Sequence, residues 1–346
     1  MGLGEVGVAV SGGRRRVKDM TLTVDADGAA PVAPDGAQLD GAQAPQETMY
    51  RPAHPLDLGR TVGMLRRGGT DPTMVADGGR LWMALDTAAG IATLCLRQTR
   101  DGIHASAWGP GAGAALDTVP RLCGADDDAS DFDISGHAAL AEVARRNPGI
   151  RLTRTDRVFD ALAMSILEQK VTAMQAFGAW RYLVTRHGER APGPTPRAMY
   201  AAPIAEQWRR IPSWEWHRAG VEPPQSRTIA RAAERAPSIA RALARSTSGA
   251  DRDRMLTSLP GIGVWTAAET RIRALGDPDA VSVGDFHLAH EVGFALAGAR
   301  TDDDGMLELL APWAGHRQRV IRLIFASGVR EPRRGARLAP EDHRAR

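Results

Sequence analysis

The sequence predicts an α+β protein, in which a small N-terminal antiparallel-sheet α+β domain is followed by an all-α domain. The stretch GRLWMALDTAAGIATLCLRQTRDGIHASAWG gives short β-rich runs broken by Gly and Asp, and CGADDDASDFDISG after it is an acidic, turn-rich linker. Beyond that linker almost every segment has helical periodicity. Because 43% of the 346 residues are hydrophobic, the chain can bury a sizeable core.

Changes in composition divide the chain into four predicted segments. Residues 1–45 mix Gly, Ala, Asp and Pro without apolar periodicity, so we expect a disordered tail. Residues 46–135 form the α+β N-terminal domain, and residues 136–330 form the all-α domain. Residues 331–346 are basic and poor in apolar side chains, and we expect a second disordered tail there.

Apolar spacing places the helices. Within LDLGRTVGMLRRG, ahead of the sheet, Leu58, Val62 and Leu65 recur at helical intervals. In the second domain, RVFDALAMSILEQKVTAMQAFGAWRYLVTRHG is helical in pattern, and its apolar face is formed by Phe159, Leu162, Ile166 and Leu167. Two proline-bearing stretches, ERAPGPTPR and WEWHRAGVEPPQSR, are expected to be loops between helices.

Composition also excludes several classes of protein. The only cysteines are Cys95 and Cys123, too few for a disulfide framework, a four-thiolate zinc site or a four-cysteine iron–sulfur cluster. No apolar run reaches the roughly 18 residues of a membrane span, and no secretory signal is recognisable. We therefore expect a cytoplasmic protein without metal or cofactor. A net charge of +3 permits contact with nucleic acid without requiring it.

The stretch LPGIGVWTAAE reads as a tight turn between two helices, DRDRMLTSL and VWTAAETRIRAL. Gly261 and Gly263 permit positive φ and close approach of another backbone, and Pro260 sets the entry to the turn. The amides of Gly261–Trp265 would then point outward at a helix N-terminus, where the macrodipole favours phosphate. By itself such a glycine pair is more typical of a purely steric turn.

LPGIGVWTA, together with VGDFHL further on, resembles the hairpin and the catalytic aspartate segment of the helix-hairpin-helix DNA glycosylases. Gly284 and Asp285 lie where that superfamily carries its Gly-Asp pair, and ALAMSILEQKVT is similar to the helix that it places near DNA. The α+β segment from about residue 50 to residue 130 looks like the extra domain of the bacterial 3-methyladenine DNA glycosylase II group. The resemblance covers roughly residues 50–330.

This resemblance implies a glycosylase that flips a damaged, alkylated base out of duplex DNA and hydrolyses its N-glycosidic bond in base excision repair. Asp285 is the expected catalytic residue, because a carboxylate stabilises an oxocarbenium-like sugar and orients water. The base pocket is assigned to Glu269, Phe286 and Trp313. DNA contacts are assigned to Gly261, Ile262, Gly263, Val264, Trp265, Thr266, Gln169, Lys170, His316 and Arg317.

Three positions depart from the family pattern. Lys170 follows Gln169 where the alkylation-repair branch carries an apolar wedge; its stem would fill the space left by a flipped base, or the wedge comes from another loop. Glu269 replaces an aromatic residue, and either reads a base edge or is an ordinary exposed carboxylate. Trp265 occupies the slot of the Schiff-base lysine, so we expect hydrolysis without lyase activity.

Two other functions stay open at this point. A helix-hairpin-helix protein can be a passive DNA-binding module, although a carboxylate at Asp285 would then only repel phosphate. A glycosylase for oxidised or mismatched bases would use the same scaffold. In all three cases the partner is duplex DNA, with a damaged base for an enzyme, and we expect a monomer in the cytoplasm, associated with the nucleoid.

Overall fold

The computed structural model describes residues 44–332, all of which belong to one compact unit. The predicted N-terminal tail lies outside the described residues except for residues 44 and 45, and so does the predicted C-terminal tail except for residues 331 and 332. The α+β fold class is confirmed, since an antiparallel sheet is followed by a helical region.

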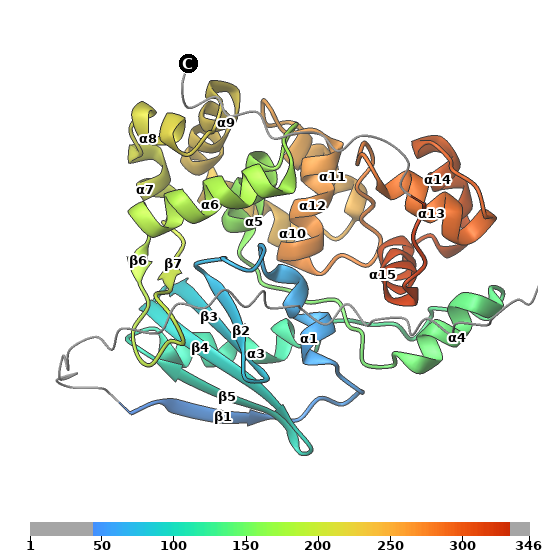
Figure 1. Cartoon of the computed structure of the whole chain (residues 1–346), viewed down its shortest axis with the longest axis horizontal. Coiled ribbons are helices and arrows are strands. Elements are labelled where there is room, and N and C mark those ends of the chain that lie inside the picture. Colours follow the sequence, from blue (N-terminus) through green and yellow to red (C-terminus); the bar gives the residue numbers. More distant parts are fainter. Residues whose placement is uncertain (1–43, 333–346) are drawn as a thin grey trace, which may run out of the picture. The chain divides into compact units, whose positions relative to one another are not determined.

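The sheet has five strands in the order β1-β5-β4-β3-β2. Their bounds are β1 Gln46–Tyr50, β2 Met74–Asp77, β3 Arg80–Thr87, β4 Gly90–Thr99 and β5 Gly102–Trp108. Strands β2 to β5 pair antiparallel with their neighbours in sequence, as the meander pattern predicted (Figure 1). Strand β1, which the sequence did not reveal, pairs with β5.

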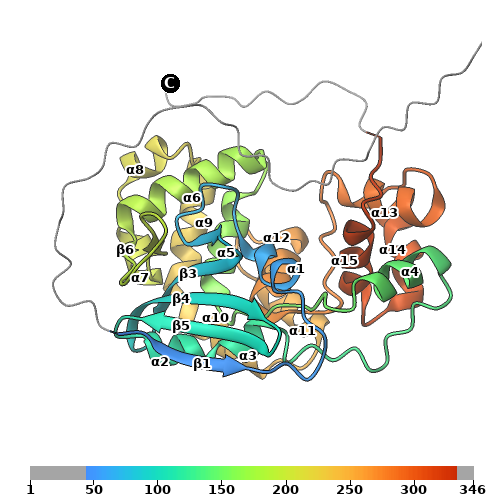
Figure 2. The same cartoon turned by 60° about the horizontal axis from the view of Figure 1, so that its bottom comes forward.

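Both faces of the sheet are buried. On one face Leu81, Met83 and Leu85 alternate along β3 and pack with the short helices α1 Leu58–Thr61, α2 Ala112–Asp117 and α3 Val119–Leu122. Helix α2 lies beside β1, β4 and β5 (Figure 2). The predicted 58–65 helix is α1 followed by a 3₁₀ turn, Gly63–Leu65, and its three apolar residues are all in this core.

A hairpin from the helical region covers the opposite face of the sheet. Trp82 and Ala84 of β3 form a cluster there with Ala201 of the short strand β7 Tyr200–Ala201. The cluster also includes Ala191, which directly follows the partner strand β6 Glu189–Arg190. The proline-bearing stretch ERAPGPTPR, predicted to be a loop, lies in this hairpin. The sheet and the helical region therefore share a buried interface.

The helical region is built from helices joined by turns and longer loops. Its helices are α4 Ala138–Arg146, α5 Val158–Leu167, α6 Ala173–His187, α7 Ala205–Arg210, α8 Ser213–Arg218, α9 Pro223–Glu234, α10 Ala236–Arg245, α11 Gly249–Thr257, α12 Val264–Leu275, α13 Leu288–Ala297, α14 Asp303–Leu310 and α15 Arg317–Ser327. Helix α5 packs against α9, α10 and α12, with Leu162, Ile166 and Leu167 fully buried as predicted. A separate core joins α4 to α13, α14 and α15.

Two sequence expectations are corrected here. The long helical stretch is broken after Leu167, because Thr172 begins α6 with a capping box in which its side chain accepts from the amide of Gln175. The stretch WEWHRAGVEPPQSR is mostly helical rather than loop. Pro223 and Pro224 lie in the first turn of α9, where proline costs no helical hydrogen bond.

The structure also bears on the membrane spans, metal sites and disulfides that the composition argued against. Between residues 44 and 332, no helix has both the length and the apolarity to cross a bilayer. In the same part of the chain, no three His, Cys, Asp or Glu side chains gather to hold a metal ion. Cys95 and Cys123 are free and buried, and burial raises their thiol pKa values to about 11 and about 12.

Candidate active site and nucleic-acid interface

The predicted hairpin is formed by α11, a turn and α12. Gly261 has φ +91°, and a Cβ at this position would lie 2.3 Å from Oγ1 of Thr228, so only glycine fits. Gly263 is the N-cap of α12, and a Cβ there would meet nothing within 4 Å. Its neighbour Val264 is 58% exposed. The first amides of α12 have no acceptor one turn earlier and carry the partial positive charge of a helix N-terminus, and at Gly263 and Val264 this end of the helix is exposed.

Gln169 braces this turn from the end of α5. Its Nε2 donates to the carbonyl of Gly261 at 3.0 Å and to Oγ1 of Thr266 at 2.9 Å. The Nε2 of buried Gln225 in turn donates to the Gln169 carbonyl at 3.0 Å. Through these contacts the hairpin has a fixed position relative to α5 and α9.

Asp285 lies in the loop that leads into α13. The preceding Gly284 has φ +87°, a conformation that favours glycine, and its amide donates to Asp303. Oδ1 of Asp285 accepts from the amides of His287 and Leu288, both at 2.9 Å, while Oδ2 accepts from Nε1 of Trp265 at 3.3 Å. Three donors therefore hold the carboxylate beside the first turn of the hairpin helix.

A cluster of charged side chains lies near Asp285. Glu269 forms an ion pair with Arg273 one turn further along α12, and it accepts a hydrogen bond from the Ser282 hydroxyl. Glu168, at the end of α5, makes no side-chain hydrogen bond or ion pair within the described part of the chain. Burial raises the pKa of Glu168; Arg273 and Arg67 lower it, and Glu269 and Asp285 raise it further. These five groups therefore share one electrostatic environment.

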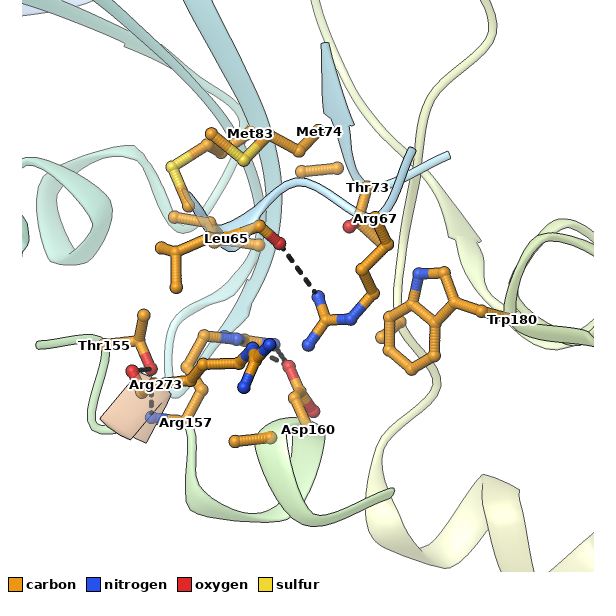
Figure 3. A pocket seen from close by; sticks show the side chains of 14 residues that line it. Leu65, Arg67, Thr73, Met74, Met83, Thr155, Arg157, Asp160, Trp180 and Arg273 are labelled. Carbon is orange, nitrogen blue, oxygen red and sulfur yellow. Dashed lines mark hydrogen bonds and ion pairs between the residues drawn. The ribbon is translucent and has the colours of Figure 1, made fainter. Parts of the chain in front are cut away.

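A cavity of about 60 Å³ lies between the sheet and the helical region. Its lining includes Arg67, Arg157, Asp160, Trp180 and Arg273. Figure 3 shows the guanidinium groups of Arg67 and Arg273 directed toward the middle of this cavity, with the Trp180 ring at one side. The Arg67 guanidinium lies 4.6 Å from the centre of that ring.

No protein-family model and no curated protein matches the sequence. Solved structures do match the fold. A 3-methyladenine DNA glycosylase from Archaeoglobus fulgidus is 15% identical with a TM-score of 0.69, over 82% of this chain and 98% of that chain. An 8-oxoguanine glycosylase/lyase from Clostridium acetobutylicum, in complex with DNA containing cytosine opposite 8-oxoguanine, is 11% identical with a TM-score of 0.63, over 82% and 97%. Its apo form has a TM-score of 0.64, over 82% and 99%.

This chain has a DNA-glycosylase fold. At 11–15% identity the likeness establishes architecture, and it includes structures of two different glycosylase types. Neither the alkylation-repair branch nor an oxidised-base specificity follows from it.

Of the residues predicted to contact DNA, some are exposed at the surface and others are buried. Gly261, Gly263 and Val264 are exposed, and so is Lys170, whose φ of +56° marks the turn after α5. Trp265 is half-buried against Asp285. The two buried members are Ile262, in the helical core, and Thr266, which accepts from Gln169. Any contact of these two with DNA would have to use the backbone.

Four further predicted residues make no side-chain hydrogen bond or ion pair with Glu269, whose partners are Arg273 and Ser282. Phe286 is 77% exposed and rests edge-on against His287, so it does not wall a closed pocket. Trp313 packs on the C-terminal helical core, and its indole donates to the Asp133 carbonyl. His316 is paired with Asp131, and Arg317 with Asp279, which lowers the pKa of Asp279 although burial opposes this. Phosphate contact by His316 and Arg317 stays a prediction.

Sequence reasoning missed four residues at the site. Arg273 lies four positions after Glu269. Opposite charges at this spacing pair on a helix, so this sequence signal could have revealed Arg273. Glu168 directly precedes Gln169, but nothing local marks it. Ser282 and Arg67 come from other segments, and only the fold brings them near α12.

Proposed function

We propose that this chain is a DNA glycosylase that flips a damaged base from duplex DNA and hydrolyses its N-glycosidic bond. The observation that carries the proposal is the position of Asp285, held by three donors beside an open helix N-terminus. A carboxylate so close to a phosphate-binding surface weakens passive DNA binding, whereas an enzyme uses it.

Each part of the reaction has a candidate group. The exposed amides at Gly263 and Val264 grip a backbone phosphate without reading bases. Asp285 stabilises the positive charge that develops on the sugar as the bond from C1′ to the base breaks. The base leaves with the electron pair of that bond, and water attacks C1′ and gives a proton to Asp285, leaving a free base and an intact abasic site. Lys170, which is exposed in the turn after α5, is our candidate for the side chain that enters the space that the base vacates.

Hydrolysis without lyase chemistry is part of the proposal. A Schiff base needs an amine near C1′, and the hairpin position beside Asp285 is filled by the indole of Trp265. Lysine occurs only as Lys18 and Lys170 in the whole sequence. A covalent mechanism would therefore have to recruit Lys170 from the turn after α5.

We further propose that the substrate is an alkylated purine. Purines methylated at a ring nitrogen carry positive charge, and the carboxylates of Glu168 and Asp285 have no ion-pair partner among residues 44–332. These charges favour a cation in the pocket. The proposed site of action is duplex DNA in the cytoplasm, with the protein acting as a monomer.

A single-turnover excision assay tests the function. Duplex oligonucleotides carrying 3-methyladenine, 7-methylguanine, hypoxanthine or 8-oxoguanine are incubated with excess protein, and abasic sites are revealed by alkali. We expect excision of at least one methylated purine. Duplex binding without excision of any of the four lesions would contradict the proposal and favour a passive DNA-binding protein.

A further inference from the structure

Arg67 is a partly buried arginine whose hydrogen-bonding capacity is mostly unused. Its Nε is buried without a partner, and its Nη1 lies 3.5 Å from the Leu65 carbonyl, at the limit of a hydrogen bond. No carboxylate of residues 44–332 forms an ion pair with it. Burial lowers its pKa, and Arg273 lowers it further, against the opposing effects of Asp71, Glu168 and Asp160. A guanidinium in this situation is suited to an acceptor that is supplied by a ligand.

The other two arginines that line the cavity already have acceptors within the protein. Arg157 pairs with Asp160 at 2.6 Å and donates to the Asp86 carbonyl at 2.5 Å. Arg273 pairs with Glu269. Arg67 is therefore the cavity-lining arginine with donors to spare, and Figure 3 shows its guanidinium directed into the space.

The residues of α12 relate Asp285 to the cavity. Trp265, Glu269 and Arg273 follow one another at four-residue spacing along one face of α12, each about one helical turn, or 5.4 Å, beyond the last. A purine is about one turn long from its glycosidic nitrogen to its 6-substituent. With the sugar at Asp285, that substituent reaches the level of Glu269, whose carboxylate pairs with the guanidinium of Arg273. Arg273 in turn lines the cavity together with Arg67.

Glu168 supplies the complementary acceptor. Its carboxyl has no hydrogen-bond partner among the described residues, and it lies within electrostatic range of Asp285, Arg273 and Arg67. A 6-oxopurine presents an acceptor at O6 next to a donor at N1–H. A 6-aminopurine presents the reverse, a donor at N6 next to an acceptor at N1. The pairing of Arg67 as donor with Glu168 as acceptor fits the first pattern and opposes the second.

We propose that Arg67 is a specificity residue that donates to O6 of the flipped base, so that the enzyme selects 6-oxopurine lesions over 6-aminopurine lesions. The selected class contains 7-methylguanine, hypoxanthine and 8-oxoguanine, and the disfavoured class contains 3-methyladenine. This inference rests on the proposed glycosylase function, and among alkylated purines it favours 7-methylguanine over 3-methyladenine.

The test compares Arg67→Met with Arg181→Met. Methionine keeps an unbranched stem against Trp180 but removes every donor. Arg181 is the matched control, because it is exposed on α6 next to Trp180 and forms no ion pair within the described residues. Single-turnover excision rates are measured for 7-methylguanine and 3-methyladenine, both cationic methylated purines, and the ratio of the two rates is compared with that of the wild type.

We expect Arg67→Met to lower the 6-oxo to 6-amino rate ratio by about tenfold or more, and Arg181→Met to change it by less than about threefold. An unchanged ratio in a folded Arg67→Met protein would overturn the inference. If that variant fails to fold, as judged by circular dichroism, Glu168→Leu decides: the ratio should fall with the N1–H acceptor gone, and an unchanged ratio would again refute it. A wild type that excises none of 7-methylguanine, 3-methyladenine, hypoxanthine and 8-oxoguanine would instead refute the glycosylase function itself.

Discussion

The indole Nε1 of Trp265 donates a hydrogen bond to Oδ2 of Asp285 at 3.3 Å, although 20 positions separate the two residues. Trp265 lies in the first turn of α12, and Asp285 caps α13 through Oδ1. The contact therefore ties the proposed phosphate-binding turn to the proposed catalytic carboxylate. A phosphate held at the hairpin positions the neighbouring sugar relative to Asp285 through a chain of fixed contacts.

The first prediction removes only this contact. Trp265→Phe keeps an aromatic ring but deletes the N–H donor, so Oδ2 of Asp285 loses its orienting bond. We expect the excision rate to fall about tenfold, the equivalent of one hydrogen bond, with duplex affinity within about threefold of wild type. Single-turnover kinetics and fluorescence anisotropy measure the two quantities. An equal loss of both would indicate that Trp265 serves DNA binding instead.

The second prediction uses the two hairpin glycines as a matched pair. In Gly261→Ala the new Cβ would lie 2.3 Å from Thr228 at a φ of +91°, so we expect a loss of about 1–3 kcal/mol or more in unfolding free energy. In Gly263→Ala the Cβ enters open space, and stability should change little.

Gly263→Ala, which should leave stability nearly unchanged, should instead weaken DNA binding. The added methyl group obstructs the exposed amides of α12, so we expect affinity for damaged and undamaged duplex to fall alike by about tenfold. Chemical denaturation and a salt titration of binding check both halves. Unchanged affinity in Gly263→Ala would show that the hairpin does not grip DNA.

The hairpin and its aspartate could be predicted because their signals are local. Gly261 and Gly284 are required by positive φ values, and each stands in a short motif where glycine is informative. The meander was predictable because β3 and β4 are short β-rich apolar runs bounded by turn residues. In both cases the sequence pattern and the structural feature that it predicts lie within the same stretch of about 20 residues.

The charged cluster could not be predicted because it joins distant segments. Arg67 follows the 3₁₀ turn before β2, and Glu168 ends α5, yet they share one electrostatic environment. Nothing in either local sequence specifies that the sheet packs against α5. The break in the helix after Leu167 could have been predicted, because the capping-box spacing of Thr172 and Gln175 is visible in the sequence. A long run without glycine or proline favoured one continuous helix instead.

The third prediction concerns the stability cost of Glu168. Burial raises the pKa of Glu168 in the folded protein above the ordinary value of 4.5. The protonated carboxyl therefore does not destabilise the fold below about pH 4.5, and stability is lost as the pH rises through the folded-state pKa and the carboxyl ionises. Glu168→Gln should therefore gain stability over wild type at pH 7 and show no such gain at pH 4. Urea denaturation at the two pH values measures this. A larger gain at pH 4 would contradict the placement of Glu168 in a desolvated cluster.

The fourth prediction separates hydrolysis from lyase chemistry. With an indole in the hairpin slot beside Asp285, borohydride should trap no covalent complex with damaged DNA, and product strands should break only after alkali. Trp265→Lys provides a control, because it introduces an amine beside Asp285. Trapping by the wild type that disappears in Lys170→Ala would show that Lys170 forms a Schiff base and would refute simple hydrolysis.

The excision rate of Asp285→Asn under single-turnover conditions tests the central claim most directly. Asparagine keeps an oxygen for the amides of His287 and Leu288, so α13 stays capped and the fold persists. What is lost is the negative charge beside the developing oxocarbenium, worth roughly 3–4 kcal/mol. The account predicts a rate lower by about 10²- to 10³-fold with duplex affinity equal to or slightly above wild type. A folded Asp285→Asn protein that excises its base within about threefold of the wild-type rate would contradict it, and would leave Asp285 as a helix cap.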